Sequence, residues 1–178
     1  MRILLSFLPF LIFALLVEHL GPNIALLAGA AVSAVLLIKD AAGGQSPKIL
    51  EIGSLVLFAG LAVYGFLTGT LFSVIGAKLA VDIGLLAIAL VSLLIRKPFT
   101  IQYAQDSVDP KYWNSPEFLR KNTTITGVWA AAFLVIVVVE ALMLYNPSIP
   151  PRYGVVVIVL ALLGAYKFTK NHSGSPKT

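Results

Sequence analysis

Six long apolar stretches run through this chain and leave little choice about its fold. They cover residues 3–20, 23–38, 49–67, 71–95, 125–145 and 153–168. Each is close to the roughly 20 residues that an α-helix needs to cross about 30 Å of hydrocarbon. Inside lipid only helices and closed barrels satisfy their own backbone groups, and the run 133–139 is apolar on every side, unlike a barrel strand. The sequence therefore predicts an all-α, polytopic transmembrane helix bundle of about six spans.

The composition agrees with burial in lipid rather than in a soluble core. Of the 178 residues, 58% are hydrophobic and 12% are charged, with a mean hydropathy of +0.93. Soluble domains average about 25% charged residues, and a domain of this size leaves much of its surface in water. We therefore expect a single transmembrane domain over residues 1–178, with the lipid bilayer as its partner. The first apolar stretch is expected to be a retained span, because no clear small-residue cleavage site follows it.

The breaks between the stretches alternate in character. Those at 21–23, 68–70 and 146–151 are short, uncharged and contain Gly or Pro, which end helices. Those at 39–48 and 96–124 are polar and basic. The chain is therefore predicted to form three helical hairpins that all open on the basic side. The first and third hairpins resemble each other, which leaves an internal repeat open as an interpretation.

Lys and Arg residues lie almost entirely on one side of this predicted topology. The chain has 13 of them, and only Lys78 and Arg152 fall toward the other side. By the positive-inside rule, the basic side is cytoplasmic. Both termini lie on that side, as do the interfacial loop 96–124 and the polar C-terminal tail 169–178. We expect a multi-pass protein of a bacterial inner membrane. Because topology accounts for the net charge of +5, no nucleic-acid partner is expected.

Three acidic residues inside the predicted spans are the first candidates for chemistry, because intramembrane ionisable residues commonly mark ion or proton sites. Counting 1.5 Å per residue from the cytoplasmic ends places Glu18, Asp82 and Glu140 about 20–22 Å up, in the outer third of the membrane. Lys78 lies four residues before Asp82, on the same helix face. These four residues form a hypothetical ion or proton site. The alternative is that the acids pair with neighbouring basic residues and only stabilise helix packing.

The connection 96–124 carries aromatic residues among Lys and Arg, which is typical of a segment in the headgroup region. Ser115 followed by Pro116 predicts a helix start that continues into the fifth span. Two interpretations stay open, an interfacial belt and a docking surface for a partner protein. The anchors of such a surface would be Tyr103, Tyr112, Trp113 and Phe118.

The residue types of common catalytic and metal centres are missing or badly placed. The chain has no Cys, which excludes thiolate ligands and cysteine nucleophiles. His19 adjoins Glu18, but adjacent helical residues face different directions, and His172 lies in the tail on the opposite side. We expect no metal, no cofactor and no enzymatic activity. Gly65 and Gly69 have the spacing of a close-packing motif, which leaves both packing within one chain and a homo-oligomer open.

Several short motifs are spread over the chain. They are Phe7-Leu8-Pro9-Phe10, Arg96-Lys97-Pro98-Phe99, Asn122 with Trp129, and Tyr166-Lys167-Phe168. Through them the chain resembles the intracellular septation protein A family of bacterial inner-membrane proteins, or a sister family of it. The resemblance implies a role in cell-envelope maintenance or septation, by contact with other inner-membrane, division or elongation proteins, and it brings no catalytic residues. The alternative function is a small transporter or an ion or proton pathway that uses the outer acids.

Overall fold

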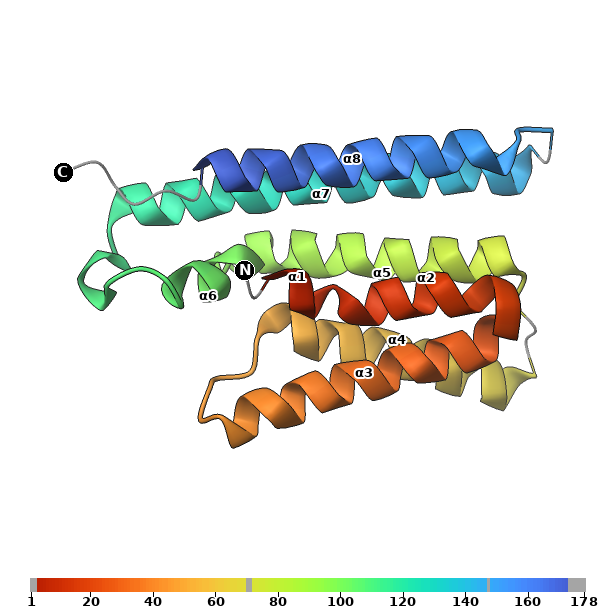
Figure 1. Ribbon diagram of the computed structural model, residues 1–178, viewed down its shortest axis with the longest axis horizontal. Coiled ribbons are helices and arrows are strands. Elements are labelled where there is room, and N and C mark those ends of the chain that lie inside the picture. The colour runs from red at the N-terminus through yellow and green to blue at the C-terminus, as the bar shows by residue number, and fades with distance from the viewer. Residues whose placement is uncertain (1–2, 70–71, 147, 173–178) are drawn as a thin grey trace. The chain divides into compact units, whose positions relative to one another are not determined.

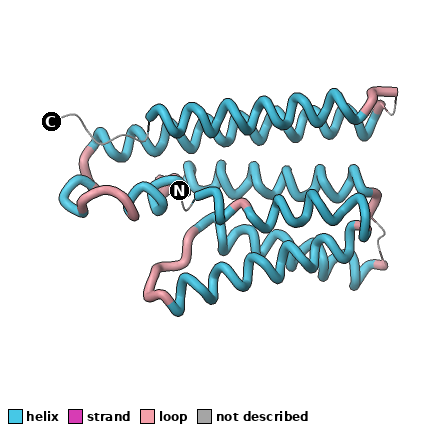
Figure 2. The backbone as a smooth tube through the Cα atoms, in the orientation of Figure 1, coloured by secondary structure: helices cyan, strands magenta, loops and turns pink. Residues whose placement is uncertain are grey.

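The computed structural model describes residues 3–69, 72–146 and 148–172 of the chain. Within these ranges all regular structure is helical and no strand is present (Figure 2). Helices long and apolar enough to cross a membrane lie at Ile3–Leu20, Pro22–Ala42, Ile49–Thr68, Val74–Leu94, Pro116–Tyr145 and Pro151–His172. The predicted all-α polytopic bundle with six spans is therefore confirmed.

The chain divides into two compact units, Met1–Leu85 and Leu86–Thr178, and the boundary falls inside one helix, α5. Of the predicted polar tail 169–178, residues up to His172 continue the last helix. The remainder of the tail lies outside the described residues, as does Arg2 of the charge pattern.

The first unit contains α1 (Ile3–Ser6), α2 (Leu8–Leu20), α3 (Pro22–Ala42), α4 (Ile49–Thr68) and the first part of α5 (Val74–Leu94). The first predicted span is interrupted at Phe7. Pro9 explains this break, because its nitrogen carries no hydrogen and cannot donate to the carbonyl of Leu5, four residues back. Gly21, with a φ of 81°, turns the chain from α2 into α3, a conformation that glycine adopts without steric cost.

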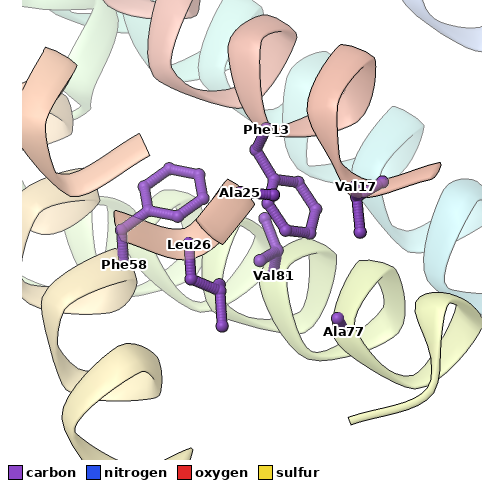
Figure 3. Close-up of a cluster of buried hydrophobic side chains, with 7 residues drawn as sticks. All are labelled: Phe13, Val17, Ala25, Leu26, Phe58, Ala77 and Val81. Atoms are coloured by element: carbon purple, nitrogen blue, oxygen red, sulfur yellow. The ribbon is translucent and has the colours of Figure 1, made fainter. Parts of the chain in front are cut away.

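A cluster of buried apolar side chains holds the first unit together. Figure 3 shows its members converging from four helices. They are Phe13, Val17, Ala25, Leu26, Phe58, Ala77 and Val81. Helix α3 packs along both α2 and α4. The second contact is close because Gly29 has no side chain, and a β-carbon built there would lie 2.7 Å from Cδ1 of the fully buried Phe58.

The second unit contains the rest of α5, α6 (Phe99–Gln105), a 3-10 turn η1 (Pro110–Tyr112), α7 (Pro116–Tyr145) and α8 (Pro151–His172). Helices α7 and α8 form an antiparallel hairpin along most of their length (Figure 1). Ser115 is the N-cap of α7, and its hydroxyl accepts a hydrogen bond of 3.2 Å from the backbone N–H of Phe118. The predicted helix start, and its continuation into the fifth span, are therefore confirmed.

Several helix boundaries differ from the predicted ones, and the largest differences are at the start of α5, the end of α3 and the end of α8, which continues past residue 168 to His172. Helix α5 begins at Val74, and its predicted start, Leu71, lies outside the described residues. The Ser73 hydroxyl accepts a hydrogen bond of 3.0 Å from the backbone N–H of Gly76, as an N-cap residue does. Helix α3 continues to Ala42, past the predicted end at residue 38, because the basic connection supplies helix-forming residues before its first glycine.

The outward helix faces carry large apolar side chains. Phe66, Leu94 and Tyr145 are each at least 80% exposed in the isolated chain. Large apolar side chains are exposed on all six spans, whereas soluble monomers rarely expose extended apolar surface. These faces fit a lipid environment, as the predicted spans require.

Candidate functional site

Two residues of the predicted outer site form an ion pair in the first unit. The ammonium of Lys78 on α5 donates a hydrogen bond to Oε1 of Glu18 at the end of α2. Asp82, one turn further along α5, is half-buried. The sequence grouped the acids by depth and Lys78 by its spacing from Asp82, and the structure shows that Lys78 reaches across to another helix. The pair is the arrangement expected when such acids stabilise helix packing.

Glu140, the third predicted acid, lies on α7 in the second unit and is buried. The proposed set of acids is therefore divided between the two units, with Glu18 and Asp82 in one and Glu140 in the other. Within its own unit Glu140 lies near the turn between α7 and α8, five residues before the end of α7.

A second polar cluster in the first unit was missed by sequence analysis. The hydroxyl of Ser6 on α1 donates a hydrogen bond of 2.8 Å to Oε1 of Glu51 in the first turn of α4. Lys48, directly before α4, pairs with Asp40 at the end of α3 at 3.5 Å. Lys48 and Glu51 are each only 4% exposed. Oε2 of Glu51 has no hydrogen-bond partner among the described residues.

The sequence carried one usable signal for this cluster. Glu51 is an acid in the first turn of an otherwise apolar span, where the helix dipole stabilises negative charge. Lys48 precedes it by three residues, a spacing that brings side chains together on a helix. Ser6, by contrast, lies 45 residues away in the sequence, and nothing local marks it as the partner of Glu51.

The two polar clusters of the first unit are separated by apolar packing. Ser6 and Glu18 lie on the same span, 12 residues apart, which corresponds to about 18 Å of helix rise. Phe13 and Val17 lie between them in the sequence and are buried in the cluster of Figure 3. Ions or protons moving along this span from Ser6 to Glu18 would have to pass this packed region.

The connection between α5 and α7 is folded, and its first turn is unusual. Arg96 has a positive φ of 56°, a conformation that costs a non-glycine residue of order 1 kcal/mol. The backbone N–H groups of Arg96 and Lys97 donate to the carbonyls of Leu93 and Ser92, at 3.0 and 2.9 Å. This pairing is the Schellman arrangement of a helix C-terminus. It places the first basic residues of the connection directly at the end of the fourth span.

Hydrogen bonds fix α6 against α7. The hydroxyl of Thr100 donates to the backbone carbonyl of Asn122 at 3.0 Å and lies 2.8 Å from the hydroxyl of Thr126. All three residues are buried. Further along, the indole of Trp129 donates to the hydroxyl of Thr169 on α8 at 3.0 Å. Asn122 and Trp129, which sequence analysis noted in the resemblance, therefore lie in the packed polar interior of the second unit.

The middle of the connection forms a second small fold. The indole N–H of Trp113 donates to the carbonyl of Val108 at 2.9 Å. The carboxylate of Asp109 accepts from the backbone N–H of Lys111 at 3.0 Å, and this hydrogen bond holds the pKa of Asp109 below its usual value. The ammonium of Lys111 lies 4.8 Å from the centre of the Tyr112 ring. These contacts close a loop of only a few residues around η1.

The four predicted docking anchors divide into two pairs. Tyr103 and Phe118 are 8% and 5% exposed, so their side chains are buried instead of facing outward. For Tyr103 the reason is helical spacing, because it lies one turn after Thr100, whose hydroxyl bonds the Asn122 carbonyl of α7. Tyr112 and Trp113 are half-buried and keep part of each ring accessible.

Among the described residues, no group of three or more His, Asp or Glu side chains is arranged to hold a metal ion. The fold and these clusters define a multi-pass, α-helical membrane protein with a folded polar connection between its fourth and fifth spans. Comparison of the chain with models of protein families, with curated proteins and with solved structures finds no match.

Proposed function

We propose that this chain is a non-enzymatic protein of a bacterial inner membrane that supports cell-envelope maintenance or septation through contacts with other membrane proteins. One observation carries the proposal. The connection 96–115 is held by its own hydrogen bonds and presents Tyr112 and Trp113 partly exposed. The resemblance to the intracellular septation protein A family supports the same role.

A folded surface of this kind suits protein recognition. Binding costs less conformational entropy when the contacting segment is already ordered. Tyr and Trp are enriched among the residues that contribute most to binding energy, because each offers a large, rigid contact area with a polar edge. In Trp113 the indole N–H is already satisfied by Val108, so its ring edge can be covered by a partner without leaving a polar group unpaired.

The charge pattern supports a cytoplasmic position for this surface. All but two of the 13 Lys and Arg residues lie on the side of the connection, and the positive-inside rule makes that side cytoplasmic, together with both termini. Division and elongation proteins of the inner membrane present cytoplasmic and juxtamembrane segments on the same side. The partner is therefore sought among membrane proteins with such segments.

The alternative function, a small transporter or an ion or proton pathway, is favoured by a specific observation. Glu51 and Glu140 are carboxylates buried within membrane spans, which is costly unless the charge is paired or used. A pathway would need the buried acids to change protonation or ligand during a cycle. A docking protein would need only that they stay hydrogen-bonded.

Complementation distinguishes the two functions. The host lacks its own septation protein A and is sensitive to envelope stress, and each variant is compared at equal membrane abundance. We expect Asp82→Asn/Glu140→Gln to rescue growth, because neutral amides keep hydrogen-bonding, and Tyr112→Ala/Trp113→Ala to fail. Tyr145→Ala removes a largely exposed aromatic from the other end of α7 and serves as the control.

A photo-crosslinking residue at position 112 tests the contact directly. We expect it to capture a membrane protein in cells, whereas the same residue at position 145 does not capture that protein. Rescue by the aromatic double variant together with failure of the acid variant would reject the docking proposal and favour the pathway.

A further inference from the structure

A groove lies between the beginning of α7 and the end of α8, within the second unit. Its volume is about 510 Å³, which is in the range of small-ligand sites. The residues that line it are Pro116, Glu117, Arg120, Lys121, Thr124, Ile125, Phe168 and His172. Neither the outer acids nor the docking surface at Tyr112 and Trp113 contributes to this lining.

Helix length places the groove at the level of the lipid headgroups. Helix α7 has 30 residues and is about 45 Å long at 1.5 Å per residue. The hydrocarbon core is only about 30 Å thick, so roughly ten residues of α7 extend beyond it. Tyr145 and the uncharged turn after it occupy the other end. The residues of α7 that extend beyond the hydrocarbon core are therefore those at the beginning of the helix, where Arg120, Lys121 and Thr124 line the groove.

The lining is basic at its rim and apolar beneath. Arg120 and Lys121 supply two cations, and Glu117 supplies one acid. The ring of His172 stacks on Phe168 with centroids 3.9 Å apart, and its Nδ1 lies 2.9 Å from the Phe168 carbonyl. The hydrogen bond at Nδ1 leaves Nε2 as the imidazole nitrogen that can meet a ligand.

We propose that this groove binds the headgroup of an anionic phospholipid. Arg120 and Lys121 contact the phosphodiester, because guanidinium and ammonium groups form charge-assisted hydrogen bonds with phosphate oxygens. Glu117 accepts hydrogen bonds from hydroxyls of the headgroup, and Phe168 with Ile125 contacts the start of the acyl chains. Basic grooves between transmembrane helices on the cytoplasmic side are suited to such headgroups. Phosphatidylglycerol carries a phosphodiester, headgroup hydroxyls and acyl chains, and it is the probe for the test.

The test measures phosphatidylglycerol binding to the purified full chain by native mass spectrometry in detergent, with phosphatidylcholine as the neutral comparison lipid. Each basic residue near a membrane surface contributes about a fivefold gain in affinity. We therefore expect Arg120→Gln/Lys121→Gln to bind phosphatidylglycerol about 25-fold more weakly. Lys167→Gln/Lys170→Gln removes the same charge from the same end of α8 but outside the groove lining, and we expect less than about a threefold loss.

A second groove variant tests the site without changing any charge, in case the loss of charge itself alters folding. Thr124→Phe keeps every charge and fills the groove, because the Thr124 side chain lies at its lining and bonds only the Arg120 carbonyl of its own helix. We expect it to weaken phosphatidylglycerol binding as well. Thermal unfolding in neutral detergent, compared across the three variants and the wild type, verifies that each is folded.

Three outcomes would overturn the proposal. Equal losses in the groove and control pairs would mean that general surface charge attracts the lipid. Unchanged binding in the groove variants would mean that the lipid binds elsewhere. Displacement of phosphatidylglycerol by millimolar glycerol phosphate would make the site one for soluble phosphate compounds instead of a lipid. Retained binding in the control pair, with loss in both groove variants and no displacement, supports the lipid site.

Discussion

Lys78 of α5 and Glu18 of α2 form an ion pair although they lie 60 residues apart in the sequence. The side chain of Lys78 is 29% exposed and that of Glu18 is 57% exposed. The pair therefore lies at the edge of the first unit, near the Gly21 turn, and not in its apolar core. It connects the beginning of α5 to the α2–α3 hairpin.

A double-mutant cycle measures what this ion pair contributes to stability. We expect Glu18→Gln and Lys78→Met each to lower the free energy of unfolding, with a coupling of about 0.5–1 kcal/mol, because both side chains are partly exposed. Reversible unfolding in mixed micelles gives the four stabilities. A coupling of zero would show that the two charges act independently in the bilayer-like environment.

The hydrogen bond between Ser6 and Glu51 is buried, so its loss should cost more. We expect Ser6→Ala to lower the free energy of unfolding by about 1–3 kcal/mol, because a buried carboxylate oxygen loses its partner. Glu51→Gln keeps the acceptor and removes a buried charge, and we expect it to cost less. The matched control is Ser33→Ala, since the buried Ser33 hydroxyl bonds only the Gly29 carbonyl of its own helix. If both serine substitutions lower the free energy of unfolding equally, the hydrogen bond to Glu51 contributes no more than a hydrogen bond within one helix.

The sequence predicted the spans well because their signal is local. An apolar run of about 20 residues identifies a membrane helix without knowledge of its neighbours, and Ser115-Pro116 identified the start of α7 by capping chemistry alone. The later start of α5 had the same kind of signal in Ser73, but the apolar residues before it hid the cap. Pro9 likewise marks the break at Phe7, which the hydropathy of the span conceals.

The pairing of polar side chains could not be predicted in the same way. Depth along a span placed Glu18 and Asp82 at similar levels, and helical spacing placed Lys78 on the face of Asp82, but which helices are neighbours depends on packing contacts such as Phe58 against Gly29. Ser6 and Glu51 meet through the same packing. The burial of Tyr103 depends on which face of α6 meets α7. A short helix of seven residues gives too weak a periodicity to decide this from sequence.

The contact between Gly29 and Phe58 predicts a strong steric effect. A β-carbon at Gly29 would lie 2.7–2.9 Å from three atoms of the Phe58 ring, and that ring is fixed by Phe10 and Phe13, with centroids 5.1 and 5.6 Å away. We expect Gly29→Ala to cost about 1–3 kcal/mol in unfolding free energy. Gly127→Ala is the control, because a β-carbon at Gly127 meets open space, and it should be neutral or slightly stabilising. Equal effects of the two substitutions would contradict the close approach of α3 and α4.

The turn around Asp109 should respond to acid. The backbone N–H of Lys111 holds the pKa of Asp109 below its usual value, so the folded turn prefers the carboxylate. Its stabilisation is therefore present above the unfolded pKa of about 3.9 and is lost as the pH falls through the lower folded pKa. We expect the indole N–H resonance of Trp113 in nuclear magnetic resonance spectra to stay constant from neutral pH to about pH 4 and to shift below it.

Asp109→Asn is the control for this titration, because its amide oxygen can still accept from Lys111 while it cannot ionise. The shift of the Trp113 resonance should then disappear in the acidic range. A shift that persists in the variant would assign the titration to another acid of the connection, such as Asp106 or Glu117.

The absence of cysteine makes the proposed topology directly testable, because every introduced thiol is the only one in the chain. Ser46 in the first basic connection, Ser107 in the second and Ser148 in the turn after α7 are all exposed. If the basic side is cytoplasmic, a membrane-impermeant maleimide added to intact spheroplasts labels Ser148→Cys but neither Ser46→Cys nor Ser107→Cys. Permeabilised cells should label all three, which verifies that each thiol is reachable. Labelling of Ser107→Cys in intact spheroplasts would place the Tyr112 and Trp113 surface outside the cell and reject a cytoplasmic partner.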